Sequence, residues 1–289
     1  MNKFNFSILC FLFALAGAGL TVTAVFSPFL LLGFVGSNYF LVALLFAVPS
    51  MGHFVGGNVW GPVIDKVGRC RPILLTASAM CVLLFVLLAI VENPWLFISG
   101  ATAISFFLSA IIAASKVYVT LTNPDSMGRT IGWLFTFEAI GFSLASFLSG
   151  QILERASTDV IGGRYLLWAM AICWFIGMMG ASAFNEEGLL PGHEQKETIS
   201  IWRDLETVYG NRALRNLSIS VFLTNGANMV LFGMFSTYFC KYLKGGQDLL
   251  GGALAAAGIG AAVISVKIGI FSDRYGHWNL LRFAALGYM

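Results

Sequence analysis

The sequence predicts an all-α, polytopic membrane protein, and three observations support this prediction. Of the 289 residues, 58% are hydrophobic and only 11% are charged, whereas ordinary soluble domains are about 25% charged. Apolar stretches of about 17 to 25 residues, the length that crosses a bilayer, follow one another along the chain. Short turns rich in Gly, Pro, Asn and Asp separate most of these stretches. One water-soluble core cannot enclose so much apolar surface, so helices that face lipid are expected.

The first four helices are predicted from the apolar stretches before residue 120. No Asp, Glu, Lys or Arg occurs from Phe4 to Ile64, and the turn GFVGSN divides this stretch into two helices. The first apolar run is too long for the core of a cleaved signal peptide, so we expect it to insert as a helix. The turns ENP and TNPDSMG end the third and fourth helices. The predicted ranges are Phe6–Leu32, Tyr39–Trp60, Pro72–Val91 and Pro94–Val119.

Four more helices are predicted by the same criteria at Thr130–Ile152, Arg164–Phe184, Ala213–Tyr238 and Leu249–Phe271. The connection between the sixth and seventh helices, Asn185–Arg212, is the one long polar stretch. Within it, Trp202, Leu205 and Tyr209 share one helical face, which favours an amphipathic helix on the membrane surface. A solvated linker with incidental aromatic residues is the alternative.

These elements predict three regions. Residues 1–184 form an N-terminal six-helix transmembrane bundle, residues 185–212 a cytoplasmic linker with the amphipathic helix, and residues 213–289 a partial C-terminal bundle. After Gly276 the chain offers only NLLRFAALGYM, Asn279–Met289, whereas a transmembrane helix needs about 20 apolar residues. We therefore interpret the sequence as a fragment that stops at the start of a ninth helix.

The distribution of basic residues predicts the orientation in the membrane. If Gly61–Arg71 lies inside the cell, most of the 17 Lys and Arg residues lie inside with it. The inside set is Lys3, Lys66, Arg69, Arg71, Arg129, Lys196, Arg203, Arg212, Arg215, Arg274 and Arg282, and the outside set is Arg155, Arg164, Lys241 and Lys244. The positive-inside rule then places the N-terminus and the central loop in the cytoplasm, with the protein in the cell membrane.

A polar motif occurs twice. GPVIDKVGRCR, Gly61–Arg71, follows the second predicted helix, and GIFSDRYGH, Gly269–His277, follows the eighth. Gly, Asp, a basic residue and Gly have the same spacing in both, at Gly61, Asp65, Lys66 and Gly68 and at Gly269, Asp273, Arg274 and Gly276. A parallel repeat of six-helix units produces such a recurrence.

The first copy resembles the G-x-x-x-D-R/K-x-G-R-R/K motif of major facilitator superfamily transporters, between helices 2 and 3 of that family. Gly61, Asp65, Lys66, Gly68 and Arg69 match it in order, whereas Cys70 departs from it and Arg71 supplies the second basic charge one residue late. The second copy departs at His277 and Trp278. NPDSMGRTIGW is also similar to the family, with Arg129 at the place of a common arginine. The resemblance implies the family's fold, two six-helix bundles, the second incomplete here.

The resemblance also implies a gating role for both copies. In the family these contacts latch the cytoplasmic ends of the two halves, and the second copy is expected to meet the fifth helix. Glycine allows a close helix approach, Asp can bind helix-end amides, and Arg can bind carboxylates or lipid phosphates. The predicted gating residues are Gly61, Asp65, Lys66, Gly68, Arg69, Arg71, Arg129, Gly269, Asp273, Arg274 and Gly276. Charges that only set topology are the alternative.

Ionisable residues within the predicted spans are the first candidates for handling substrate or protons, because burying a charge in a bilayer is costly. Glu138 in the fifth helix and Lys116 in the fourth lie at similar depths. We expect them to contact one another, as a structural ion pair or as a proton-responsive one.

Polar residues that lack a charge are the other candidates. Asn225 and Asn228 share a face of the seventh helix, and Thr21 lies in the first. The family resemblance implies that these three residues line the central cavity. Hydrogen bonding between helices is an equally good interpretation. Gly252, Ala256 and Gly260 are expected to form a helix-packing face.

The predicted function is secondary active transport of a small solute by alternating access, with efflux as one direction. A non-transporting receptor or interaction protein on the same scaffold is the alternative.

The sequence does not decide whether transport is coupled to protons. Phe106 and Phe107 stand where proton-coupled antiporters of the family often have arginine, which weakens but does not exclude proton coupling. No catalytic motif occurs, and the five scattered cysteines suggest no disulfide or metal site, so neither an enzyme nor a cofactor is predicted. The partners are the solute and the bilayer, and the basic loops need no nucleic acid.

Overall fold

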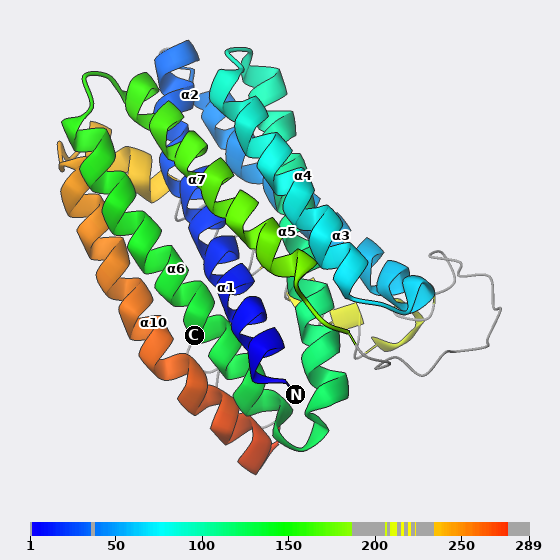
Figure 1. The fold of residues 1–289 in the computed structure, drawn as a ribbon. Coiled ribbons are helices and arrows are strands. Elements are labelled where there is room, and N and C mark those ends of the chain that lie inside the picture. Colours follow the sequence, from blue (N-terminus) through cyan, green and yellow to red (C-terminus); the bar gives the residue numbers. More distant parts are fainter. Residues whose placement is uncertain are drawn as a thin grey trace.

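The computed structural model describes residues 2–35, 38–186 and 234–276, with a few isolated positions between 206 and 223. Every regular element in these ranges is helical (Figure 1). Trp202 and Leu205 of the predicted amphipathic helix, most of the predicted helix Ala213–Tyr238, and the predicted ninth helix lie outside the described residues. Tyr209 is described and exposed. Residues 234–241, at the end of that seventh helix, are helical.

The first span is interrupted by a π-helical segment. It consists of α1 (Lys3–Leu20), η1 (Thr21–Phe26) and α2 (Ser27–Val35), where the sequence predicts one uninterrupted helix. The hydroxyls of Thr21 and Thr23 donate to the carbonyl oxygens of Gly17 and Gly19, at 2.9 and 2.7 Å. Hydroxyls that bond back to carbonyls compete with the backbone ladder, which accounts for a local widening of the helix.

The remaining helices match the predicted ones, and most extend beyond them. They are α3 (Tyr39–Val67), α4 (Arg71–Ile90), α5 (Pro94–Thr122), the short η2 (Pro124–Ser126), α6 (Met127–Arg155), α7 (Asp159–Ser182) and α10 (Gln247–Tyr275). Helix α4 has the predicted length, shifted by one residue. Apolar content predicted shorter helices because it marks the hydrocarbon core, whereas a helix continues until a cap stops it. Gly68 ends α3 with φ of 65°, and the Thr158 hydroxyl accepts from the Ile161 amide to begin α7.

These longer helices change where the repeated motif lies. Gly61 and Asp65 belong to the last turns of α3, and Gly269 and Asp273 to the last turns of α10. The motif is therefore a helix ending rather than a loop.

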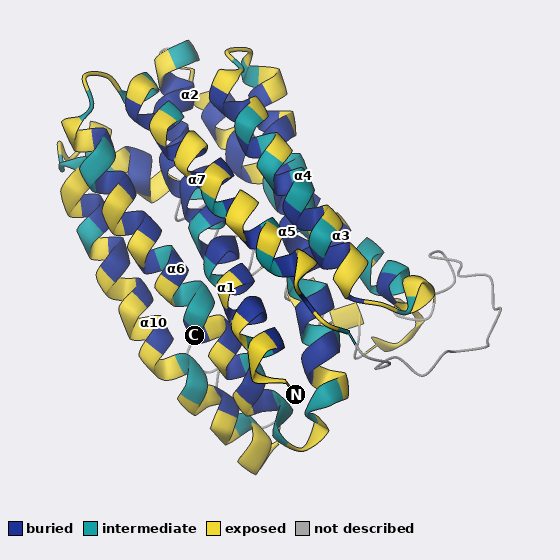
Figure 2. Ribbon diagram, viewed as in Figure 1, coloured by how far each residue is buried: buried dark blue, intermediate teal, exposed yellow. Residues whose placement is uncertain are grey.

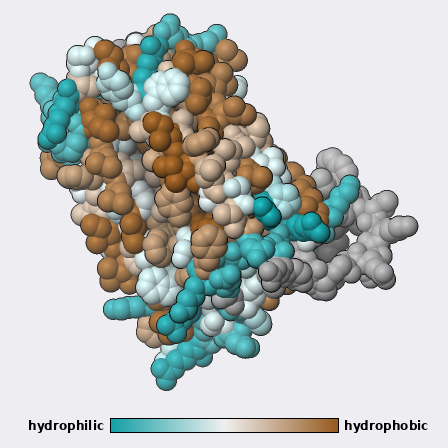
Figure 3. All heavy atoms as spheres, viewed as in Figure 1, coloured by the Kyte–Doolittle hydropathy of each residue, from teal (hydrophilic) through white to brown (hydrophobic). Residues whose placement is uncertain are grey.

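The described residues contain seven helices that are long and apolar enough to cross a membrane. The span that begins with α1 is the most buried of the seven, and yellow exposed residues lie on the outward faces of α4, α6 and α10 in Figure 2. Figure 3 shows hydrophobic residues over the middle of this face and hydrophilic ones toward its ends. This distribution suits a helical protein whose middle contacts lipid.

Two ends of the molecule are distinguished below. The motif end holds the C-terminal ends of α3 and α10 and the N-terminal ends of α4 and α6. The opposite end holds the C-terminal end of α6 and the N-terminal ends of α7 and α10.

Helices α6 and α10 form a close antiparallel pair (Figure 1). The pair depends on glycines: a Cβ at Gly150 would lie 2.4 Å from the Gln247 carbonyl oxygen, and one at Gly251 would lie 2.4 Å from that of Ser146. At the other end Gly269 packs on Gly128. Such contacts let two backbones approach closely.

Among the described residues, the face of α10 that packs on α6 is offset by one residue from the predicted packing face. A Cβ at Gly252 or Gly260 would meet no described atom within 4 Å, and Ala256 is exposed. The buried face is instead Gly251, Ala255, Gly258, Ala262 and Gly269. Small residues occur on several faces of this helix, so spacing alone did not identify the one that packs.

Candidate functional site

A cavity of about 730 Å³ lies between α1, α6 and α10. Its walls are apolar for the most part, with Leu20, Phe135 and Phe142 among them, and glycines from all three helices bring the backbone to its surface. Glu138 is the one ionisable side chain in this lining. The cavity has the size and character of a site for a small, largely apolar molecule.

Glu138 is held in place by the crossing of α1 and α6. A Cβ at Gly17 would lie 2.0 Å from the Glu138 carbonyl oxygen, and one at Gly141 would lie 1.9 Å from that of Ala14. The two backbones therefore touch beside Glu138. Its Oε2 is buried and has no hydrogen-bond partner among the described residues. A buried polar atom without a partner raises the free energy of the folded state, so a ligand that offers a donor would relieve this cost.

Lys116 and Glu138 do not form the predicted ion pair, although their charges lie close enough to interact. No ion pair joins the two residues, and Lys116 Nζ lies 5.0 Å from the centre of the Phe135 ring instead. The aromatic face attracts the ammonium group and competes for it. Position along the helices predicts similar depths for the two residues but could not show that Phe135 also lies within reach of Lys116.

The Thr21 hydroxyl hydrogen-bonds within the protein. Besides its bond to Gly17, its hydroxyl lies 3.5 Å from the carbonyl oxygen of Phe142 on α6, and the side chain is fully buried. This favours the predicted alternative, hydrogen bonding between helices, for Thr21. Asn225 and Asn228 lie outside the described residues.

The second motif copy contacts the N-terminus of α6, the predicted fifth helix. The two carboxylate oxygens of Asp273 accept from the backbone amides of Gly128 and Arg129, both at 2.8 Å. A carboxylate at this position satisfies free amides and interacts favourably with the helix dipole. The Arg129 side chain is exposed, Arg274 lies 5.4 Å from the Tyr275 ring, and Gly276 ends α10 with φ of 82°. The expected contact between the second copy and this helix is confirmed.

The first motif copy makes few contacts with described residues. A Cβ at Gly61 would meet no described atom within 4 Å, and the side chains of Asp65, Lys66 and Arg69 are exposed. The Arg71 guanidinium donates to the Ser182 carbonyl oxygen at 2.6 Å. Of the two copies, only the second reaches another helix through its glycine and aspartate in the described part of the chain.

A family model described as Major Facilitator Superfamily matches residues 9–289. The chain belongs to the Major Facilitator Superfamily. The predicted fold class, an all-α polytopic membrane protein of this superfamily, is thereby confirmed.

Curated relatives include two proteins named Multidrug resistance protein MdtG. The one from Dickeya zeae (strain Ech586) is 24% identical over 245 residues, which are 82% of this chain and 57% of the relative. The one from Salmonella choleraesuis (strain SC-B67) is also 24% identical, over 82% of this chain and 58% of the relative. This superfamily member thus spans less than two thirds of the length of these relatives.

Solved structures give the same fold. The proton:xylose symporter XylE is 16% identical with a TM-score of 0.65, and the match covers 95% of this chain and 70% of that one. The nucleoside transporter NupG is 13% identical with a TM-score of 0.62, covering 96% and 69%.

Three carboxylates at helix ends were missed by the sequence analysis of this superfamily member. Glu186 accepts from the backbone amides of Cys70 and Arg71, at 2.7 and 2.9 Å, and so caps α4. Burial and the nearby Glu186 raise the pKa of the Cys70 thiol to about 12. Glu154 caps α10 by accepting from the Gln247 amide at 3.0 Å. Glu92 pairs with Arg164. Their distant partners left no signal in the sequence beyond the free amides that every helix start must satisfy.

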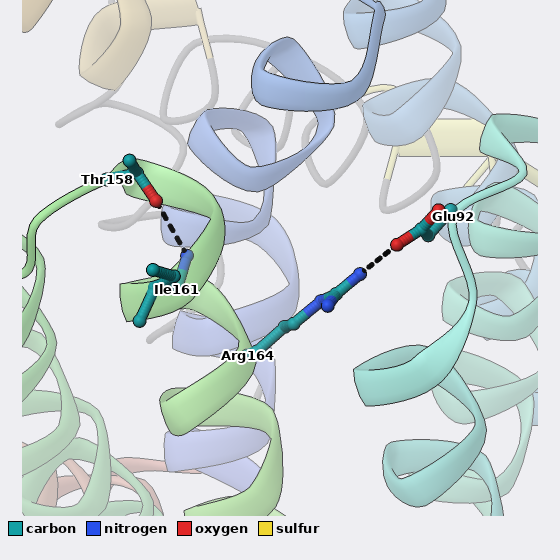
Figure 4. A network of polar contacts seen from close by, with 4 residues as sticks. All are labelled: Glu92, Thr158, Ile161 and Arg164. Atoms are coloured by element: carbon teal, nitrogen blue, oxygen red, sulfur yellow. Dashed lines mark hydrogen bonds and ion pairs between the residues drawn. The ribbon is translucent and has the colours of Figure 1, made fainter.

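The Glu92 pair fastens the α4–α5 turn to α7 at the opposite end. Figure 4 shows the Arg164 side chain extended toward Glu92, with Thr158 capping the start of the same helix. The Arg164 guanidinium also lies 5.9 Å from the Phe34 ring. Among the described residues, no group of three or more His, Cys, Asp and Glu side chains is placed to hold a metal ion.

Proposed function

We propose that this protein is a secondary active transporter that moves a small solute across the membrane by alternating access. The cavity between α1, α6 and α10, with the unpaired Glu138 Oε2 at its wall, is the observation that supports this most directly. Membership of the superfamily and likeness to XylE and NupG support the transport mechanism.

The proposed solute is largely apolar and carries one amine or another hydrogen-bond donor. Apolar walls favour the apolar part, and Glu138 offers an acceptor for the donor. Phe142 beside it can stabilise a cationic group through its ring face. Efflux is the proposed direction, and the relatives named as multidrug resistance proteins support it.

The proposed gate at the motif end is the Asp273 contact with α6, with Gly269, Arg274, Gly276 and Arg129 around it. Gly61, Asp65, Lys66, Gly68, Arg69 and Arg71 are proposed to make the equivalent contacts of the first copy. The positive-inside rule supports placing this end, the N-terminus and the central loop in the cytoplasm of a cell-membrane protein. The proposed regions remain residues 1–184, 185–212 and 213–289.

A flux assay tests the proposal. The full-length protein is reconstituted in proteoliposomes, and uptake of a panel of radiolabelled apolar amines and neutral analogues is measured with and without a pH gradient. Saturable flux that depends on a gradient supports transport and identifies the coupling ion. Absence of flux for every compound, with binding retained, would instead support a non-transporting receptor on the same scaffold.

The variant Glu138→Gln separates two roles for the carboxylate. The amide keeps a hydrogen-bond acceptor but removes the negative charge. Flux of amines should fall while flux of neutral donors persists if the charge is used. Thr21→Ser, which keeps the hydroxyl outside the cavity lining, is the control and should leave both fluxes unchanged.

A further inference from the structure

The α6–α10 pair is capped at both ends, and each helix supplies the cap of the other. At the motif end Asp273 of α10 caps α6, and at the opposite end Glu154 of α6 caps α10. Both helices have 29 residues, so the two caps lie about 43 Å apart at 1.5 Å per residue. Both caps are formed together in this structure.

The cap at the opposite end belongs to a larger polar cluster. The side-chain amide of Gln247 donates to Asp159 Oδ1 at 3.0 Å, and Lys241 Nζ lies 3.7 Å from Asp159 Oδ2. Glu154, Asp159, Lys241 and Gln247 line a polar pocket of about 450 Å³. Glu154 comes from α6 and Asp159 from α7. Lys241 ends the 234–241 helix, and Gln247 begins α10. Every contact in the cluster therefore joins the part of the chain before residue 186 to the part after residue 234.

We propose that Glu154, Asp159, Lys241 and Gln247 form a latch that holds the opposite end closed, as the counterpart of Asp273 at the motif end. This inference rests on the proposed alternating access, in which each end opens in turn. Opening the opposite end separates the start of α10 from the end of α6, so it must break the Glu154 cap. Opening the motif end must break the Asp273 cap and can leave the Glu154 cap intact.

The two caps differ in strength. Asp273 accepts two backbone hydrogen bonds, whereas Glu154 accepts one, and the Glu154 side chain is exposed. Water can replace an exposed contact at little cost. The Gln247 and Lys241 contacts with Asp159 supplement the single cap, so the latch depends on all four residues.

Cys240 provides a reporter at this latch. It lies in the lining of the same pocket and is half-buried, next to Lys241. Cys10, Cys70 and Cys81 are buried, and Cys173 on α7 is the other half-buried cysteine. In a Cys173→Ala background, the rate at which a maleimide labels Cys240 reports how often the opposite end opens. The reaction needs no transported solute.

The experiment uses the full-length protein in lipid nanodiscs, where both ends are open to the reagent. Glu154→Ala removes both the cap and the negative charge, whereas Glu154→Gln removes the charge but keeps an acceptor oxygen. Loss of a cap of ordinary strength should raise the labelling rate about fivefold in Glu154→Ala, and Glu154→Gln should stay within about twofold of the parent. Gln247→Ala, which removes only the side-chain contact with Asp159, should give a smaller rise than Glu154→Ala.

Two results would overturn the latch. One is a parental labelling rate in folded Glu154→Ala, and the other is an equal rise in Glu154→Ala and Glu154→Gln, which would assign the effect to charge near the thiol. If Glu154→Ala does not fold, an unchanged rate in Gln247→Ala overturns it instead. Since labelling is measured without solute, a protein that transports nothing can still pass this test, and a transporter can still fail it.

Discussion

Asp273, in the last turn of α10, accepts the backbone N–H of Gly128, at the first turn of α6, at a distance of 2.8 Å. The second carboxylate oxygen accepts from the next amide, so a single side chain joins two helices that are far apart in sequence. Gly269 lies against Gly128 one turn earlier in α10 and allows the close approach that this contact requires. The charge and the glycine of the motif thus act on the same helix end.

Removal of the Asp273 carboxylate should open the motif end. Asp273→Ala leaves two backbone amides of α6 without partners, which costs about 1 kcal/mol as for other helix caps. The variant should populate the state that is open at the motif end more often. Because the two ends open in turn, the opposite end is then closed more often, so labelling of Cys240 should slow by about fivefold. Asp273→Asn, which keeps an acceptor, is the control. Faster labelling in Asp273→Ala than in the parent would contradict coupling between the two ends.

The α6–α10 contact should tolerate an added methyl group at one glycine of α10 and not at its neighbour. A Cβ at Gly251 would meet the Ser146 carbonyl oxygen at 2.4 Å, whereas a Cβ at Gly252 would meet no described atom within 4 Å. Gly251→Ala should lower the free energy of unfolding by about 1 to 3 kcal/mol through overpacking. Gly252→Ala should be neutral or stabilising by up to about 1 kcal/mol because alanine favours the helix. Thermal unfolding in detergent compares the two, and equal melting temperatures would refute the assigned packing face.

The pair of Glu92 and Arg164 should depend more on Arg164 than on Glu92. The Glu92 side chain is 74% exposed and that of Arg164 is 34% exposed, and an exposed ion pair contributes less than about 1 kcal/mol. Glu92→Gln should therefore change the melting temperature little. Arg164→Ala also loses the packing of its guanidinium on Phe34 and should destabilise more. High salt should weaken the effect of Glu92→Gln on the melting temperature. A larger drop in melting temperature for Glu92→Gln than for Arg164→Ala would contradict the greater role assigned to Arg164.

Thiol labelling should depend steeply on pH. Burial, with help from Asp159 and Glu154, raises the pKa of Cys240 to about 11, and burial with Glu186 raises that of Cys70 to about 12. Both thiols are protonated at neutral pH, and only the thiolate reacts readily. The labelling rate of Cys240 should thus rise about tenfold per pH unit until pH approaches its pKa. Cys70 is 1% exposed and should react only after unfolding. A labelling rate of Cys240 that reaches a plateau near pH 9 would show that the pKa of its thiol is not raised.

The helices could be predicted from sequence because crossing a bilayer requires long apolar stretches. Such a stretch must form a helix in lipid, where its backbone groups have no water to bind. The meeting of Asp273 with α6 could also be predicted, because the repeated motif supplied a likeness to a known family. Most helices were predicted too short, since caps such as Thr158 at the start of α7 and Gly68 at the end of α3, rather than hydrophobicity, set where a helix begins and ends.

The site was harder to predict because its contacts join residues far apart in sequence. The expected pair of Lys116 and Glu138 failed because Phe135 lies beside the ammonium group. Nothing in the sequence distinguishes Glu154 from other charges near helix ends, and only the packing of α10 gives it a partner. Glu138 was recognised because an acidic residue within a span is rare whatever its surroundings.

The π-helical segment at Thr21–Phe26 sets the rotational phase of the first span. A π turn contains one residue more than an α turn, so side chains after Phe26 are rotated by about 100° from where an uninterrupted α-helix would point them. The residues of α1 and α2 therefore follow two separate helical registers, and a substitution scan should show a break between them. Deletion of one residue within Thr21–Phe26 would merge the registers and turn every side chain of α2 to a new direction, whereas point substitutions that keep the hydroxyls of Thr21 and Thr23 would leave the register intact.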